Sequence, residues 1–142
     1  NIMFWVESGN AAEDPKWLCV SDAAAGFVFK NGNWTSTKIL AKNYRYIVSR
    51  KPIQVSRDEF IKGDVIYQVS ELGKQFSQDI LCGKGFPNDD GLLVCGGAAI
   101  SFRLDIESLR YIRGWLVGYT GFKGDDENSP SPFIEIGMCS PF

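Results

Sequence analysis

The stretch AGFVFKNGNWTSTKI, residues 25–39, decides how this chain begins to fold. Asn31-Gly32 separates two alternating segments. Asn-Gly is the strongest short-range signal for a two-residue hairpin loop, because a type I′ turn needs positive φ at both central residues. The loop length sets the register, so Phe29 is expected opposite Trp34. We therefore predict a β-hairpin over about residues 24–40.

The aromatic face of this hairpin has two interpretations. Phe27 and Ser36 share a face with the Phe29–Trp34 pair, and cross-strand aromatic pairs stabilise a hairpin and hold its register. We expect this face to point inward and to pack in the core. The alternative is that its aromatic side chains stack on a ligand.

Strand patterns dominate the chain from Trp17 onward. After the hairpin, strand-like segments occur at 43–50, 64–72, 99–105, 109–122 and 133–139. Gly114 and Gly118 indicate bends, bulges or close packing. The total is about seven or eight strands joined by short turns, which favours antiparallel pairing. We therefore predict an all-β fold, a small antiparallel barrel or a sandwich.

We expect a single domain. Residues 1–16 are typical of a loose N-terminal leader, and residues 17–142 are expected to form one β domain, long enough to bury a core. The first residues, NIMFWVESGN, lack the basic and apolar regions of a secretion signal, so we expect a mature chain. No apolar run reaches about 18 residues, so we do not expect the chain to span a membrane.

The composition argues against several functions. Hydrophobic residues make up 44% and charged residues 23%, as in ordinary globular proteins. The net charge of −2 argues against a nucleic-acid partner, which favours a dominant basic surface. The chain has no histidine, which removes the Ser-His and Cys-His nucleophile pairs and the usual zinc ligands. We therefore expect neither an enzyme nor a bound cofactor or metal.

Four cysteines are expected to form two disulfides. Cys82 and Cys95 frame a glycine-rich segment that we expect to be a loop, while Cys19 and Cys139 lie near opposite ends of the chain. We predict the pairs 19–139 and 82–95, one of three possible connectivities, with four reduced thiols as the alternative. The first pair would staple the first strand to the last. Disulfides are typical of an oxidising compartment, so we expect a periplasmic or secreted protein.

Two resemblances add to these expectations. The motif C-x₆-GFVFKNGNW, followed by YRYIVSR and by the C-terminal SPFIEIGMCSPF, resembles a group of small secreted or periplasmic bacterial proteins without assigned function. This resemblance covers most of the chain. It implies a disulfide-stapled β domain, a periplasmic address and the pairing of the end cysteines.

The second resemblance covers three residues. Gly32-Asn33-Trp34 is similar to the G-x-W motif of lipocalin-type barrels, in which the Trp closes one end of the barrel. It implies a barrel topology. The basic residue that such folds place over the Trp has no match here, since only Lys123 is basic after Arg113.

The longest loop supplies the candidate binding site. Residues 121–132, GFKGDDENSPSP, are acidic and rich in glycine and proline. An acidic loop on a rigid frame suits insertion into a cationic cleft of a protein partner in the cell envelope. We therefore hypothesise a non-catalytic binding module of an inhibitor or immunity type. The candidate binding residues are Tyr119, Phe122, Lys123, Asp125, Asp126 and Glu127.

Three alternatives remain open. A carrier would hold a small apolar ligand inside the barrel. The aromatic residues that would line its interior are Phe27, Phe29, Trp34, Tyr44, Tyr46 and Trp115. Calcium binding by GDDEN, residues 124–128, is a second alternative, since oxygen ligands suit that cation. An enzyme using carboxylates alone would need two acids to converge in a pocket.

Overall fold

The computed structural model describes residues 14–40, 44–52, 61, 63–73, 79–120 and 128–142. Over these residues the chain is all-β, as predicted, and contains no helix. The strands are β1 (Trp17–Lys30), β2 (Asn33–Ile39), β3 (Arg45–Pro52), β4 (Val65–Glu71), β5 (Ile80–Leu81), β6 (Leu92–Gly96), β7 (Ile100–Asp105), β8 (Arg110–Trp115) and β9 (Phe133–Pro141). No helix that could cross a membrane is found in the described part of the chain.

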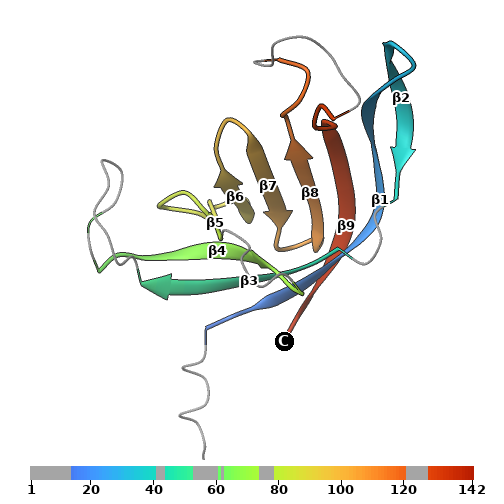
Figure 1. The fold of residues 1–142 in the computed structure, drawn as a ribbon. Coiled ribbons are helices and arrows are strands. Elements are labelled where there is room, and N and C mark those ends of the chain that lie inside the picture. Colours follow the sequence, from blue (N-terminus) through green and yellow to red (C-terminus); the bar gives the residue numbers. More distant parts are fainter. Residues whose placement is uncertain (1–13, 41–43, 53–60, 62, 74–78, 121–127) are drawn as a thin grey trace, which may run out of the picture.

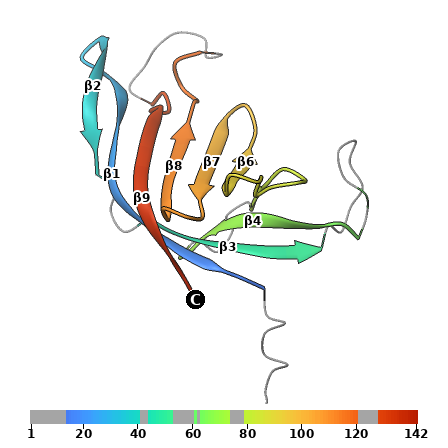
Figure 2. The same cartoon turned by 180° about the vertical axis from the view of Figure 1, so that it is seen from behind.

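The strands form one antiparallel sheet that curves into a nearly closed barrel. Eight strands follow the order β5-β4-β3-β1-β9-β8-β7-β6, and β2 pairs with β1 beside this path. Figures 1 and 2 show β6 to β9 and β1 as one curved wall, with β3 and β4 crossing below it. The β1–β2 hairpin extends away from β3 and β4 at the opposite end of β1.

Two disulfides connect neighbouring strands and confirm the predicted pairs. Cys19 of β1 and Cys139 of β9 are bonded partners that also face each other in the strand register. Cys82 and Cys95 are bonded across an isolated β-bridge, which joins the end of β5 to β6. The first bond therefore fixes the first strand to the last, and the second closes the barrel between its two outermost strands.

The predicted hairpin register is confirmed. Phe29 pairs with Trp34 and Lys30 with Asn33, and Asn31 and Gly32 both adopt positive φ in the loop. The hairpin reaches from the Ala24–Ile39 pair to its loop, close to the predicted bounds.

The prediction that the aromatic face of the hairpin packs in the core is wrong. Phe27 is 51% exposed, and Phe29 and Trp34 are half-buried outside the core cluster. The cause is an irregularity in β1 between Ser21 and Ala23, where the register against β9 shifts. An extra residue reverses which side chains face inward, because the side chains of a strand alternate.

The reversal can be followed along β1. Before the shift the odd-numbered residues Trp17 and Cys19 are buried, whereas after it the even-numbered Ala24 is buried. Gly26 continues the inward row, and a Cβ at this position would lie 2.1 Å from the carbonyl oxygen of Pro132. Phe27 and Phe29 therefore point outward. The inner face of this half of β1 carries the small residues Ala24 and Gly26.

Two other segments differ from the sequence-based expectation. The strand predicted over 109–122 ends at Trp115, because Gly118 turns the chain with φ of +120° and lies against the backbone of Pro130. A Cβ at Gly118 would lie 1.8 Å from the Pro130 carbonyl oxygen, so the turn requires glycine. The cysteine-framed segment is not all loop, since Leu92–Gly96 pairs with β7 as β6.

The core fills the half of the barrel where β1, β3 and β4 face β6 to β9. Its largest buried side chains are apolar or aromatic, apart from one carboxylate, Glu135. The cluster consists of Trp17, Cys19, Tyr46, Val48, Val69, Cys82, Leu93, Cys95, Phe102, Leu104, Tyr111 and Cys139. Within it the Phe102 and Tyr111 rings stack, and the Tyr46 ring stands edge-on to both.

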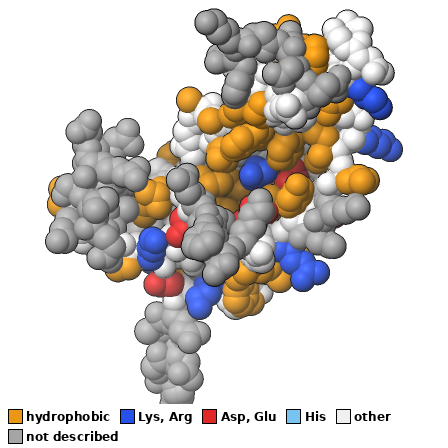
Figure 3. All heavy atoms as spheres, in the orientation of Figure 1, with side chains coloured by type: hydrophobic (Ala, Val, Ile, Leu, Met, Phe, Trp, Pro, Cys, Tyr) orange, Lys and Arg blue, Asp and Glu red, His pale blue; other side chains and the backbone are white. Residues whose placement is uncertain are grey.

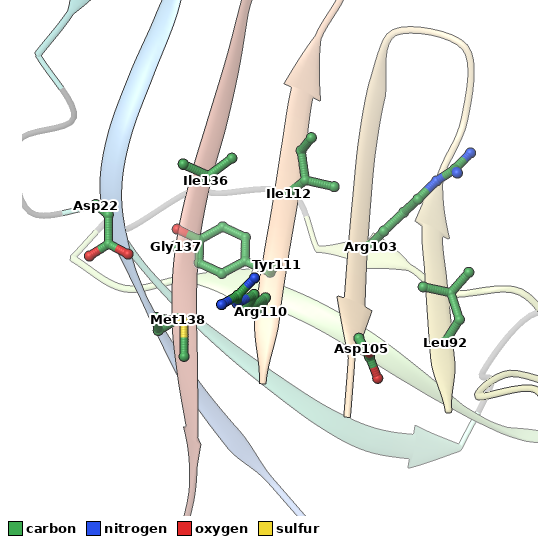
Figure 4. A pocket seen from close by; sticks show the side chains of 10 residues that line it. All are labelled: Asp22, Leu92, Arg103, Asp105, Arg110, Tyr111, Ile112, Ile136, Gly137 and Met138. Carbon is green, nitrogen blue, oxygen red and sulfur yellow. The ribbon is translucent and has the colours of Figure 1, made fainter. Parts of the chain in front are cut away.

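Gly137 makes room for one of these rings. It pairs with Tyr111 across β8 and β9, and the Tyr111 ring lies against it, as Figure 4 shows. A Cβ at Gly137 would lie 2.4 Å from this ring and 2.3 Å from the carbonyl oxygen of Val20. Gly137 therefore allows Tyr111 to lie flat on β9.

We predict that Gly137→Ala destabilises the protein. The added methyl overpacks the core, for which a cost of about 1–3 kcal/mol in the free energy of unfolding is typical. Gly114→Ala is the matched control, because a Cβ there meets no atom within 4 Å. Denaturant unfolding followed by near-UV circular dichroism measures both variants. Equal stability of the two variants would contradict this account of Gly137.

Candidate functional site

The strand register builds a ladder of inward-facing residues across β7, β8 and β9. Phe102 pairs with Arg113, and Arg113 pairs with Glu135, so these three form one row. The next row on the same face lies two residues away on each strand. It consists of Ile100, Trp115 and Phe133. Because side chains alternate, both rows point to the inside of the barrel.

Glu135 lies at the centre of this ladder and is fully buried. Tyr46 Oη donates a hydrogen bond of 2.9 Å to its Oε1, and Tyr111 Oη donates one to its Oε2. Arg113 forms an ion pair with Glu135, with its Nη1 3.7 Å from Oε1. Both carboxylate oxygens therefore have hydroxyl donors from two separate strands, β3 and β8.

Burial raises the pKa of both tyrosines. The pKa of Tyr46 lies well above its ordinary value of 10.0 because of burial, and the Glu135 carboxylate adds to the rise while Arg113 opposes it. The pKa of Tyr111 is raised by burial and by its hydrogen bond to Glu135. Both phenols therefore remain protonated, and their two neutral hydroxyls donate hydrogen bonds to the Glu135 carboxylate.

Arg113 lies between Glu135 and the apolar row of Ile100, Trp115 and Phe133. Its guanidinium lies 5.4 Å from the centre of the Tyr46 ring and 5.5 Å from that of Phe133. Its side chain is only 12% exposed, and its Nε is buried with no hydrogen-bond partner in the described part of the chain. The neighbouring Ile100, Trp115 and Phe133 are half-buried.

Figure 3 views the molecule from the side on which β3 and β4 lie. Hydrophobic side chains gather over β6 to β9 there, with basic and acidic atoms at their centre. The ends of β7, β8 and β9 that carry Ile100, Trp115 and Phe133 point away from β3 and β4 (Figures 1 and 2). The strand register places Arg113 and Glu135 in the row next to Ile100, Trp115 and Phe133, so this inner face is apolar beside one ion pair.

The outer face of the barrel carries an open pocket of about 640 Å³, shown in Figure 4. Ile112, Ile136 and Met138 project from β8 and β9 on this side, and each is more than a third exposed. Charged residues flank them: Asp22, Arg103, Asp105 and Arg110. The pocket thus combines an apolar centre with a mixed-charge rim.

A third feature lies at the tip of the β1–β2 hairpin. The Phe29 and Trp34 rings are 5.7 Å apart, and Trp34 and Tyr119 are 5.5 Å apart, between ring centres. Tyr119 is 65% exposed, so the cluster opens to solvent. It joins two segments that are distant in sequence.

The hairpin also holds both ends of the loop 121–132. Tyr119 precedes the loop and contacts Trp34, while the carbonyl oxygen of Pro132 at its end accepts a 3.0 Å hydrogen bond from the Phe27 backbone N–H. Of the binding residues predicted from sequence, the structure places Tyr119 in this cluster. The other five lie outside the described residues: Phe122, Lys123, Asp125, Asp126 and Glu127.

The six aromatic residues proposed to line a carrier's interior do not share one surface. Tyr46 is part of the core, Tyr44 packs against it, and Trp115 lies on the apolar inner face of β7 to β9. The other three belong to the hairpin: Phe27, Phe29 and Trp34. Trp34, which carries the G-x-W resemblance, contacts Phe29 and Tyr119 in this structure.

Sequence reasoning missed the Glu135 cluster, although one signal was present. In FIEIGMC the isoleucines and Met138 alternate with Glu135, and an apolar face is ordinarily assigned inward. Cys139 is two steps of two residues from Glu135, and its buried disulfide sets which face points inward. The disulfide prediction therefore already implied a buried carboxylate.

No protein-family model, curated protein sequence or solved structure matches this chain.

We predict that stability falls as the pH rises above about 10, the ordinary tyrosine value. The folded state keeps Tyr46 and Tyr111 protonated, whereas the unfolded chain loses these protons, so alkali favours unfolding. Urea unfolding between pH 8 and alkaline pH measures the slope. Tyr46→Phe removes one of the two groups and is expected to flatten the slope. A slope unchanged by this substitution would contradict the prediction.

Proposed function

We propose that the protein is a secreted or periplasmic, non-catalytic binding module that recognises a protein partner through the hairpin tip and the loop 121–132. The observation that carries this proposal is the aromatic cluster of Phe29, Trp34 and the exposed Tyr119 beside the anchored ends of that loop. Tyr and Trp are the residues that most often dominate the binding energy of protein interfaces.

The scaffold supports such a role. Two disulfides fix β1 to β9 and close the barrel, so the hairpin projects from a frame with little freedom to rearrange. A rigid frame reduces the entropy that is lost on binding. Disulfides persist in oxidising compartments, which supports the proposed address outside the cytosol.

The acidic sequence of the loop suggests the character of the partner. Residues 124–127 read Gly-Asp-Asp-Glu, so the loop would complement a basic cleft, as an inhibitor or immunity-type protein does. The aromatic cluster would supply affinity at the base, while the acidic residues would supply association rate and selectivity.

We predict that Tyr119→Ser abolishes capture of the partner. Immobilised wild-type protein is incubated with a cell-envelope extract, and retained proteins are identified by mass spectrometry. Loss of an aromatic hot spot costs about 2 kcal/mol or more, a weakening of roughly thirtyfold. Leu40→Ser is the control, because Leu40 is exposed just beyond the other end of β2 and away from the hairpin tip.

A partner retained by the wild type and by Leu40→Ser, but lost with Tyr119→Ser, would support the proposal. Equal retention by all three proteins would overturn the role of the hairpin tip. Replacing residues 124–128 by Gly-Ser in the same assay separates the contribution of the acidic loop. We expect this variant to bind more weakly and to lose most of the salt dependence of binding.

A further inference from the structure

The charge on Arg113 is not satisfied by the carboxylate beside it. Glu135 already accepts hydrogen bonds from Tyr46 and Tyr111, one on each oxygen. The 3.7 Å separation between Arg113 Nη1 and Glu135 Oε1 is an ion pair without hydrogen-bond geometry. The guanidinium therefore keeps hydrogen-bonding capacity, and its buried Nε has no partner among the described residues.

This unused hydrogen-bonding capacity is unusual because the Arg113 side chain is largely buried. A buried donor left without a partner destabilises the fold, because it has lost its hydrogen bonds to water. The two aromatic rings that flank the guanidinium, those of Tyr46 and Phe133, attract its charge but accept no conventional hydrogen bond.

The row above Arg113 offers an apolar surface to whatever binds it. Trp115 pairs with Ile100 on one side and with Phe133 on the other, and all three side chains are half-buried on the inner face. Next to Phe133, Gly26 of β1 presents backbone in place of a side chain. An apolar body lying here would bury further surface of these residues, which favours binding.

We propose that Arg113, with Ile100, Trp115 and Phe133, forms a binding site for a small carboxylate with an apolar body. The ligand carboxylate would accept hydrogen bonds from the guanidinium, which matches its geometry, and the apolar part would lie along the row above. A monoanion fits better than a phosphate dianion, because the acidic Glu135 already lies beside Arg113. This site is separate from the hairpin tip and does not depend on the proposed function.

Isothermal titration calorimetry of the full chain at pH 7 with three probes tests the proposal. Octanoate carries both features of the ligand, octan-1-ol lacks the charge, and inorganic phosphate lacks the apolar body. We expect saturable octanoate binding with a Kd below about 1 mM, and at least about tenfold weaker binding of the other two. No saturable octanoate binding, or octan-1-ol or phosphate bound as tightly as octanoate, would overturn the proposal.

Variants assign the binding to Arg113. Arg113→Gln is expected to weaken octanoate binding at least about tenfold, and Arg113→Lys to retain part of the affinity. The matched control is Arg110→Gln, on the same strand but on the outer face, which should bind as the wild type does. Unchanged affinity in Arg113→Gln would reject the site.

A readout on stable protein covers the case in which Arg113→Gln fails to fold. Trp115→Leu leaves Arg113 in place and is expected to weaken octanoate binding while leaving phosphate binding unchanged. In wild-type protein labelled with ¹⁵N-arginine, the Nε–Hε signal of Arg113, identified by its absence in Arg113→Lys, should shift as octanoate is added. A signal that stays in place through saturation would overturn the proposal.

Discussion

The antiparallel pairing of β1 with β9 is the constraint on which the rest of the structure depends. It joins the first strand to the last, carries the Cys19–Cys139 disulfide, and turns an open meander into a barrel. It also contains the register shift between Ser21 and Ala23, which decides which half of β1 lines the core. Before the shift β1 contributes Trp17 and Cys19 to the core, and after it the strand presents its aromatic residues to solvent.

A second constraint follows from β9 itself. The parity that buries Cys139 also buries Gly137 and Glu135, so the barrel must accommodate a carboxylate in its interior. An ionised group in such a place is tolerated only when it is hydrogen-bonded and paired, and removing one partner of such a group typically costs about 3–5 kcal/mol. The tyrosines of β3 and β8 supply those bonds, and Gly137 gives the Tyr111 ring its position. The polar cluster thereby links the two walls of the barrel at a defined register.

The two proposed sites arise from the same pair of strands by different routes. On the inside, the pairing of β8 with β9 brings Arg113 next to Glu135 and below the row of Trp115 and Phe133. On the outside, the turn after β8 brings Tyr119 to Trp34, while the segment before β9 is tied to β1 through Pro132. One site is suited to a small ligand because it places one guanidinium beside a row of half-buried apolar side chains. The other is suited to a protein because the exposed Tyr119 lies beside the half-buried Phe29 and Trp34 of a projecting hairpin.

The sequence by itself determined the local structure of this protein. Asn31-Gly32 specified the hairpin and its register, alternation specified most of the strands, and the positions of the four cysteines indicated the correct disulfides. These features depend on contacts between neighbouring residues or on covalent chemistry, and both leave a signal in the sequence. Among the binding residues expected from sequence, Tyr119 alone lies in the described part of the chain, and its contact with Trp34 was not foreseen.

Only the tertiary structure decided which faces point inward and which residues meet. A one-residue irregularity in β1 reverses the face on which every later side chain of that strand lies, and no local sequence pattern predicts it. The Glu135 cluster draws on β3, β8 and β9, whose members lie 24 and 89 residues apart from Glu135 in the chain. Such a cluster exists only after the strands have paired, since each of its side chains taken alone is an ordinary strand residue.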